Sequence, residues 1–162
     1  MPRPRPAPAI AVVARGIAGT WRVAAQVAAR LPDGGVVALQ GGLGAGKTTF
    51  VQGLARALGI RRPVTSPTFT LVGEYQGTRL RLVHVDLYRL RAPDDLDAIG
   101  FEEYLERGAL LAIEWPERAG DWIPAEAVRV ALRPGADLRT RRIEVRYPAG
   151  MTPPARCRQV RR

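Results

Sequence analysis

The stretch that decides the fold is VVALQGGLGAGKTTF, residues 36–50. Its first four residues are an apolar run typical of a buried parallel strand, and residues 41–48 match G-x-x-x-x-G-K-[ST] at every fixed position. Residues 48–58 then follow a helical pattern that Gly59 ends. A strand, a glycine-rich loop and a helix in this order predict a phosphate-binding loop, or P-loop, and therefore a site for a nucleoside triphosphate.

The loop residues have complementary roles in holding phosphates. Glycines leave backbone N–H groups free to surround an anion at the positive end of the helix dipole. Lys47 adds a mobile positive charge for the β and γ phosphates, and the Thr48 hydroxyl is suited to ligate Mg²⁺. We therefore expect ATP as the substrate and Mg²⁺ as the cofactor. The loop residues expected at the nucleotide are Gly41, Gly42, Leu43, Gly44, Ala45, Gly46, Lys47 and Thr48.

Composition argues that this motif is not a chance match. Lys47 is the only lysine among 25 basic residues, and an arginine could not replace its compact ammonium in a tight phosphate nest. The same scarcity excludes a GTPase, whose base-reading [NT]-K-x-D motif needs another lysine. Ser66 is the only serine, and its surroundings do not resemble the L-S-G-G-Q signature of transporter ATPases.

Two acidic residues follow buried-type strands and could complete the site. Asp86 ends RLVHVD and Glu114 ends LLAIE, so both are expected at the carboxyl edge of the sheet, where open α/β folds bind ligands. Either acid could be the second Mg²⁺ ligand besides Thr48, and either could orient the attacking water in a reaction assisted by Lys47. His84 lies on the same strand face as Asp86, and a structural role is favoured for it over a catalytic one.

Two further segments have two interpretations each. Ser66 and Thr68 lie between the P-loop helix and the next strand, where hydroxyls can act as a switch that senses the γ-phosphate, but Ser-Pro-Thr is equally a turn. Trp115 follows Glu114 and could place its indole over the nucleotide or simply cover the core. The sequence alone does not separate these alternatives.

The remaining pattern predicts one α/β domain over residues 1–147, with a disordered leader at 1–8 and no signal peptide. We expect a P-loop NTPase fold with a mostly parallel central sheet flanked by helices, closed by antiparallel strands at 128–132 and 139–147. Strands at 9–14, 70–75, 79–85 and 109–113 and helices at 20–31 and 94–107 complete the prediction. Residues 148–162 are expected to form a disordered, basic Pro/Arg-rich tail.

The net charge of +10 is concentrated in the two ends of the sequence. Residues 133–162 carry nine arginines against two acids, whereas residues 16–132 are balanced at 13 basic and 13 acidic side chains. Such a run is usually a solvated face or tail, and RNA contact is the alternative. No apolar run approaches the roughly 20 residues of a membrane span, and the single cysteine, Cys157, fits a reducing compartment, so we expect a soluble cytoplasmic protein.

Five segments taken together resemble the bacterial TsaE family, the ATPase that assists threonylcarbamoyladenosine formation on tRNA. They are GGLGAGKTTF, SPTFTLVGEY, HVDLYRL, IGFEEYL and IEWPER, in family order and near family spacing over residues 20–132. The family usually has aspartate where this chain has Gly42. The arginine-rich segment after residue 133 has no counterpart in the resemblance.

The resemblance implies slow ATP hydrolysis that depends on partners, the TsaB and TsaD proteins, with tRNA involved indirectly. It implies Lys47 at the phosphates, Thr48 and Glu114 at the magnesium, and Asp86 in catalysis. It also places Thr20, Thr49 and Trp115 at the nucleotide. Two other functions remain open at this stage: a small-molecule P-loop kinase, and an RNA-binding module that uses the basic ends.

Overall fold

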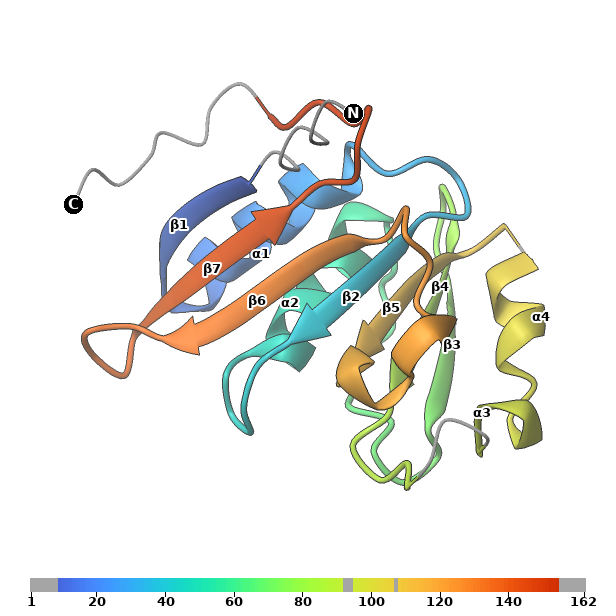
Figure 1. Ribbon diagram of the computed structural model, residues 1–162. Coiled ribbons are helices and arrows are strands. Elements are labelled where there is room, and N and C mark those ends of the chain that lie inside the picture. Colours follow the sequence, from blue (N-terminus) through green and yellow to red (C-terminus); the bar gives the residue numbers. More distant parts are fainter. Residues whose placement is uncertain (1–8, 92–94, 107, 155–162) are drawn as a thin grey trace, which may run out of the picture.

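A computed structural model describes residues 9–91, 95–106 and 108–154. One seven-stranded sheet runs through it in the order β1-β7-β6-β2-β5-β4-β3 (Figure 1). Its central strands pair in parallel (β6 with β2, β2 with β5, β5 with β4), and the antiparallel pairs lie toward the two edges. The predicted P-loop NTPase fold, with a mostly parallel centre and antiparallel closing strands, is confirmed. The strands are β1 (Ala9–Arg15), β2 (Val36–Gln40), β3 (Val72–Gln76), β4 (Arg81–Asp86), β5 (Leu110–Glu114), β6 (Val128–Pro134) and β7 (Thr140–Arg146).

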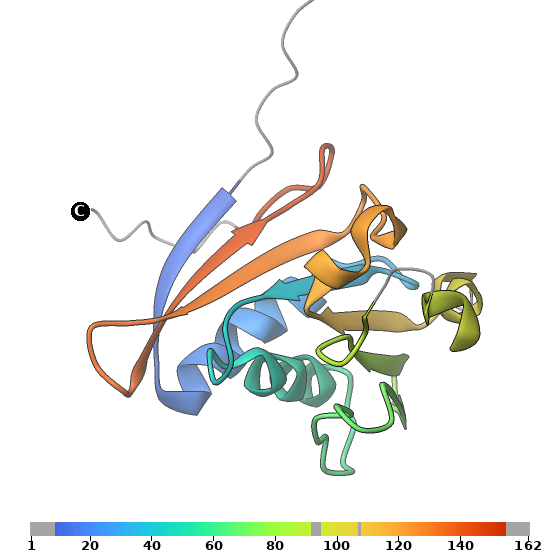
Figure 2. The same cartoon turned by 60° about the horizontal axis from the view of Figure 1, so that its bottom comes forward.

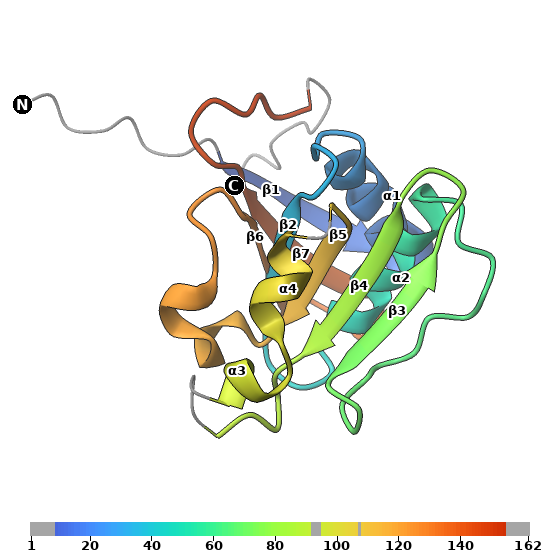
Figure 3. The same ribbon diagram turned by 90° about the vertical axis from the view of Figure 1, so that its right-hand side faces the viewer.

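Helices cover both faces of this sheet, as the turned views show (Figures 2 and 3). The two long helices, α1 (Gly16–Ala28) and α2 (Lys47–Ala57), pack side by side on one face. The short helices α3 (Asp95–Ala98) and α4 (Phe101–Glu106) and the 3-10 turns η1 (Pro116–Arg118) and η2 (Gly120–Trp122) lie on the other. Because central strands have a helix layer on each side, they are apolar throughout, as the VVAL run of β2 and the LLAI run of β5 show.

Successive side chains of each strand point to opposite faces of the sheet, so the hydrophobic core consists of two clusters, one on each face. Residues such as Val37, Leu39 and Ala112 face α1 and α2, whereas Ala38 and Ile113 face the short helices. Asp86 and Glu114 are partners in the β4–β5 register, so both acids end their strands at one edge of the sheet, as the sequence predicted. The P-loop follows β2 at that same edge (Figure 1).

The structure differs from the predicted element boundaries at both ends of the chain. The first helix begins at Gly16, directly after β1, rather than at residue 20, because Gly16 has a φ of 62° that turns the chain from strand to helix. Residues 148–154 were expected to belong to the disordered tail, yet Met151 packs against the core and Arg30 Nη1 donates to the Thr152 carbonyl oxygen at 3.4 Å. The expected leader at 1–8 and the remainder of the tail, 155–162, lie outside the described residues.

No helix in the described part of the chain combines the length and apolar character that crossing a membrane requires.

Candidate functional site

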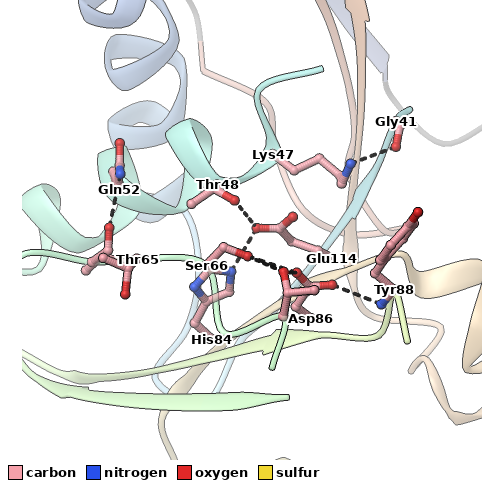
Figure 4. Close-up of polar contacts among 12 residues, drawn as sticks. Gly41, Lys47, Thr48, Gln52, Thr65, Ser66, His84, Asp86, Tyr88 and Glu114 are labelled. Atoms are coloured by element: carbon pink, nitrogen blue, oxygen red, sulfur yellow. Dashed lines mark hydrogen bonds and ion pairs between the residues drawn. The ribbon is translucent and has the colours of Figure 1, made fainter. Parts of the chain in front are cut away.

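The lysine of the phosphate-binding loop donates hydrogen bonds to backbone carbonyl oxygens of the same loop. Lys47 Nζ donates to the carbonyl oxygens of Gly41 at 2.8 Å and Gly42 at 2.9 Å (Figure 4). Its side chain is buried, which lowers the pKa of the ammonium, while the carboxylates of Glu114, Asp86 and Glu117 oppose this shift. The ammonium is therefore a charge partly deprived of water, and it gains when an anion enters the loop.

Glu114 joins the P-loop helix to the neighbouring strand. Its Oε1 atom accepts a hydrogen bond from Thr48 Oγ1 at 2.8 Å and lies 2.9 Å from His84 Nε2 (Figure 4). All three residues project from the edge at which β4, β5 and α2 meet, and Glu114 and His84 are buried. A neutral imidazole with its proton on Nε2 satisfies this contact and orients the carboxylate.

Asp86 holds the segment that the sequence marked as a possible switch. Its Oδ2 atom accepts hydrogen bonds from Ser66 Oγ at 3.0 Å and from Thr68 Oγ1 at 2.7 Å. Its Oδ1 atom accepts from the Tyr88 backbone N–H at 2.9 Å. The two hydroxyls also lie 2.7 Å from each other. The loop after α2 is thus tied to β4 through a buried carboxylate rather than being a free turn.

Trp115 lies both against the core and beside the lysine. Its ring packs against the second core cluster and against Tyr88, with ring centroids 5.0 Å apart, and Lys47 Nζ lies 4.0 Å from its centroid. Its backbone is in the left-handed region with a φ of 59°, which is costly for a non-glycine residue. This conformation turns the chain sharply after Glu114 and directs the indole toward the phosphate loop.

These side chains share one cavity of about 530 Å³, a volume suited to a nucleotide-sized ligand. The cavity brings together most of the predicted site residues but does not include Gly41, Gly42 and Ala45 in its walls. The predicted residues that line it are Thr20, Leu43, Gly44, Gly46, Lys47, Thr48, Thr49, Ser66, Thr68, Asp86, Glu114 and Trp115.

Sequence reasoning did not find the opposite wall of this cavity. Ile17 lies in the first turn of α1, Leu138 in the β6–β7 connection and Arg141 near the start of β7. The Gly16 backbone N–H donates to the Arg139 carbonyl at 2.7 Å and fixes these two segments against each other. Ile17 and Leu138 are apolar and exposed, which suits the flat face of a base, while Arg141 adds a permanent positive charge near Gly46. No local motif marks these positions.

Gly42 can be substituted where its neighbour Gly41 cannot. A Cβ atom added at Gly42 meets nothing within 4 Å, whereas one added at Gly41 would lie 2.6 Å from the Leu132 carbonyl oxygen. The aspartate that the resemblance leads one to expect at position 42 would therefore fit the same backbone.

We expect the Gly42→Ala variant to keep the parent's free energy of unfolding or gain about 0.5 kcal/mol, because it restricts only the unfolded chain. The matched Gly41→Ala variant should lose about 1–3 kcal/mol, because the loop or β6 must shift. Urea unfolding of both variants measures the difference. Equal destabilisation of the two would show that the loop does not have this backbone.

The donor set at Thr48 and Glu114 fits Mg²⁺, because a hydroxyl and a carboxylate oxygen are ligands of the kind that this hard cation prefers. Thr48 Oγ1 and Glu114 Oε1 are joined by a hydrogen bond of 2.8 Å, so one ion could contact both oxygens. Over residues 9–91, 95–106 and 108–154, no group of three or more His, Cys, Asp or Glu side chains could hold a metal ion by itself. Mg²⁺ commonly takes one or two protein oxygens and completes its shell with phosphates and water.

Comparison with known proteins agrees with this geometry. Residues 15–143 match the family model described as "Threonylcarbamoyl adenosine biosynthesis protein TsaE". The tRNA threonylcarbamoyladenosine biosynthesis protein TsaE of Treponema pallidum is 46% identical over 125 residues, which cover 77% of this chain and 92% of that protein. Its Bacillus subtilis counterpart is 38% identical over 118 residues, 73% of each chain.

A solved structure gives the same result for the fold. The crystal structure of Bacillus subtilis YdiB superposes with a TM-score of 0.74 at 30% sequence identity, covering 89% of this chain and 88% of that one. The family model covers more than half of the chain, from β1 into β7, and includes every residue of the cavity. The chain therefore belongs to the TsaE family of tRNA threonylcarbamoyladenosine biosynthesis.

Proposed function

We propose that the chain binds ATP with Mg²⁺ in the P-loop cavity and hydrolyses it slowly, in the cytoplasm, to support tRNA threonylcarbamoyladenosine formation with the TsaB and TsaD proteins. The observation that carries this proposal is the convergence of the single lysine, the Thr48–Glu114 oxygen pair and Asp86 on one cavity of about 530 Å³. Family membership supports the pathway.

Each residue has a part that follows from its position. Lys47 exchanges its bonds to the loop carbonyls for the β and γ phosphates. Thr48 and Glu114 would hold Mg²⁺, whose charge would offset the negative charge that develops on the phosphates. Asp86 is placed to orient the attacking water, and its bonds to Ser66 and Thr68 link the γ-phosphate region to the switch segment. Thr20, Thr49 and Trp115 line the remainder of the nucleotide site.

Removal of the Glu114 charge tests the metal part of this proposal. We expect the Glu114→Gln variant to lose at least about 100-fold in Mg²⁺-dependent ATP turnover while the affinity for ATP measured in EDTA changes by less than about fivefold. Glutamine keeps the shape and one oxygen, so Thr48 and His84 keep a partner. Phosphate release and calorimetry measure the two quantities.

The matched control is Glu126→Gln, which removes an exposed carboxylate from the segment before β6. This variant should turn over ATP at close to the parent rate. If the Glu114→Gln variant lost affinity for ATP in EDTA as strongly as it lost turnover, Glu114 would be a structural residue and the proposed metal site would be wrong.

A further inference from the structure

In the described part of the chain, one half of one sheet face has no helix over it. Helix α1 packs behind β1 and β7, and α2 packs behind β5, whereas the short helices and 3-10 turns on the opposite face lie over β2, β5 and β4 (Figures 1 and 2). Among the described elements, none covers the outward side of β1, β7 and β6 (Figure 1). Side chains that alternate outward on these three strands therefore form a continuous surface.

This surface carries two arginine pairs in direct register. Arg129 of β6 is the cross-strand partner of Arg146 of β7, and Arg133 is the partner of Arg142. All four arginines are exposed, and together they are called the basic face here. The carboxylate between the two pairs is Glu144, which lies 2.6 Å from Arg146 Nε. Four arginines against one carboxylate leave a net charge of +3 on the described outward positions of β6 and β7.

Like charges directly opposite each other weaken a sheet, so the register places these arginines at a cost to stability. Short side chains neighbour the arginines: Ala131 lies between Arg129 and Arg133 on β6, and Ala11 and Val13 lie on β1 opposite Glu144 and Arg142. Two surface cavities lie over these short side chains. The first, of about 460 Å³, is lined by Arg133 and Arg142, among others. The second, of about 170 Å³, is lined by Arg129, Arg133 and Arg146, among others. Along each strand the arginines are about 13 Å apart.

We propose that the basic face binds the phosphate backbone of tRNA. A guanidinium group can donate two parallel hydrogen bonds to phosphate oxygens. A bound polyanion would also offset the repulsion between the two positive charges of each arginine pair. None of the three strands carries an aromatic residue on which an unstacked base could lie, so the contacts are to the backbone of a folded RNA and not to its bases. RNA is favoured over an acidic protein because the family acts in tRNA modification.

The basic face is separate from the nucleotide cavity. Glu114 and Lys47 lie on the side of the sheet that α2 covers, whereas the basic face lies on the opposite side of β6 and β7. RNA binding at this face therefore does not require ATP hydrolysis, and the two proposals can fail independently.

The test compares two double variants of the full chain that remove the same charge. Arg133→Ser with Arg142→Ser removes one arginine pair of the basic face. Arg22→Ser with Arg79→Ser removes two exposed arginines from α1 and from the β3–β4 turn, whose side chains make no observed hydrogen bond, ion pair or ring contact within the described residues. The probe is an unmodified tRNA transcript, and fluorescence anisotropy between about 50 and 200 mM salt gives both the affinity and its salt dependence.

We expect the basic-face variant to bind tRNA about tenfold more weakly, with a slope of log affinity against log salt smaller in magnitude by about 1.5. The control variant should stay within about twofold of the parent with an unchanged slope. Calorimetric affinity for ATP should be equal in all three proteins, and the Tm of the basic-face variant should equal or exceed the parent's, because a like-charge pair has been removed.

Equal losses in the two variants would show that tRNA senses only net charge, and unchanged binding in both would show that tRNA does not use this face. Either result overturns the proposal. Loss of binding to purified TsaB or TsaD protein in the basic-face variant, with tRNA affinity unchanged, would overturn it in favour of a protein partner.

Discussion

The Lys47→Ala variant is expected to bind ATP at least about 100-fold more weakly than the parent, a loss of about 2.7 kcal/mol or more. The ammonium is held at the mouth of the loop by two carbonyl oxygens and is buried between the loop and Trp115. Its removal leaves the glycine cradle in place but takes away the only lysine that can reach the β and γ phosphates. Calorimetry with ATP and Mg²⁺ measures the loss.

The single lysine also provides a direct control for this variant. Amine-reactive labelling of the parent can modify one side chain, Lys47, besides the chain's α-amino group, and mass spectrometry separates the two. Bound ATP with Mg²⁺ should protect Lys47 from labelling, while AMP, which has no β or γ phosphate, should not. Labelling of Lys47 at the same rate with ATP as without it would contradict the role assigned to it.

The second large effect is expected at Asp86. The Asp86→Asn variant should lose at least about 100-fold in ATP turnover, because the carboxylate is proposed to orient the attacking water in the transition state. Affinity for ATP should change by less than about fivefold, or 1 kcal/mol. Asparagine keeps an oxygen for the Tyr88 N–H, and the Ser66 and Thr68 hydroxyls can rotate to accept from its amide, so the fold should tolerate the change.

A double variant separates the two roles that the geometry gives to Asp86. Ser66→Ala with Thr68→Val removes both hydroxyl donors and keeps the carboxylate. If Asp86 acts on the reaction, this double variant should retain more turnover than Asp86→Asn. If the two proteins lost turnover equally, Asp86 would act by anchoring the switch segment. A strong loss of affinity in Asp86→Asn would instead exchange the roles given to Asp86 and Glu114.

Features that depend on a few consecutive residues could be predicted from the sequence. The loop, its strand and its helix follow from residues 36–58, and Asp86 and Glu114 were placed at one edge because each ends an apolar run. The outcome for His84 was only half predicted, since a structural role was favoured for it but its contact with Glu114 depends on the register between β4 and β5. The alternation of residues shows which face of the sheet a side chain lies on, but it does not show which residue of the adjacent strand lies opposite it.

Features that depend on long-range pairing were missed. Ile17 and Arg141 meet at the cavity because β1 pairs with β7 across most of the length of the chain, a contact that no local pattern encodes. The strand predicted at 139–147 already contained Arg142 and Arg146, whereas Arg133 was left outside the strand predicted at 128–132 and lies within β6. Alternation in RRIEVR shows that Arg142 and Arg146 share a face, but only the register shows that each lies opposite another arginine.

The most direct test of the central claim is phosphate release from ATP by the purified full chain, measured alone and with TsaB and TsaD proteins. Parent and Lys47→Ala proteins are compared in Mg²⁺ and in EDTA. The account predicts slow release by the parent alone, a rise when both partners are added, and loss of that release in EDTA or in the Lys47→Ala variant. Release that continued at the parent rate in the Lys47→Ala variant, or that did not depend on Mg²⁺, would contradict it.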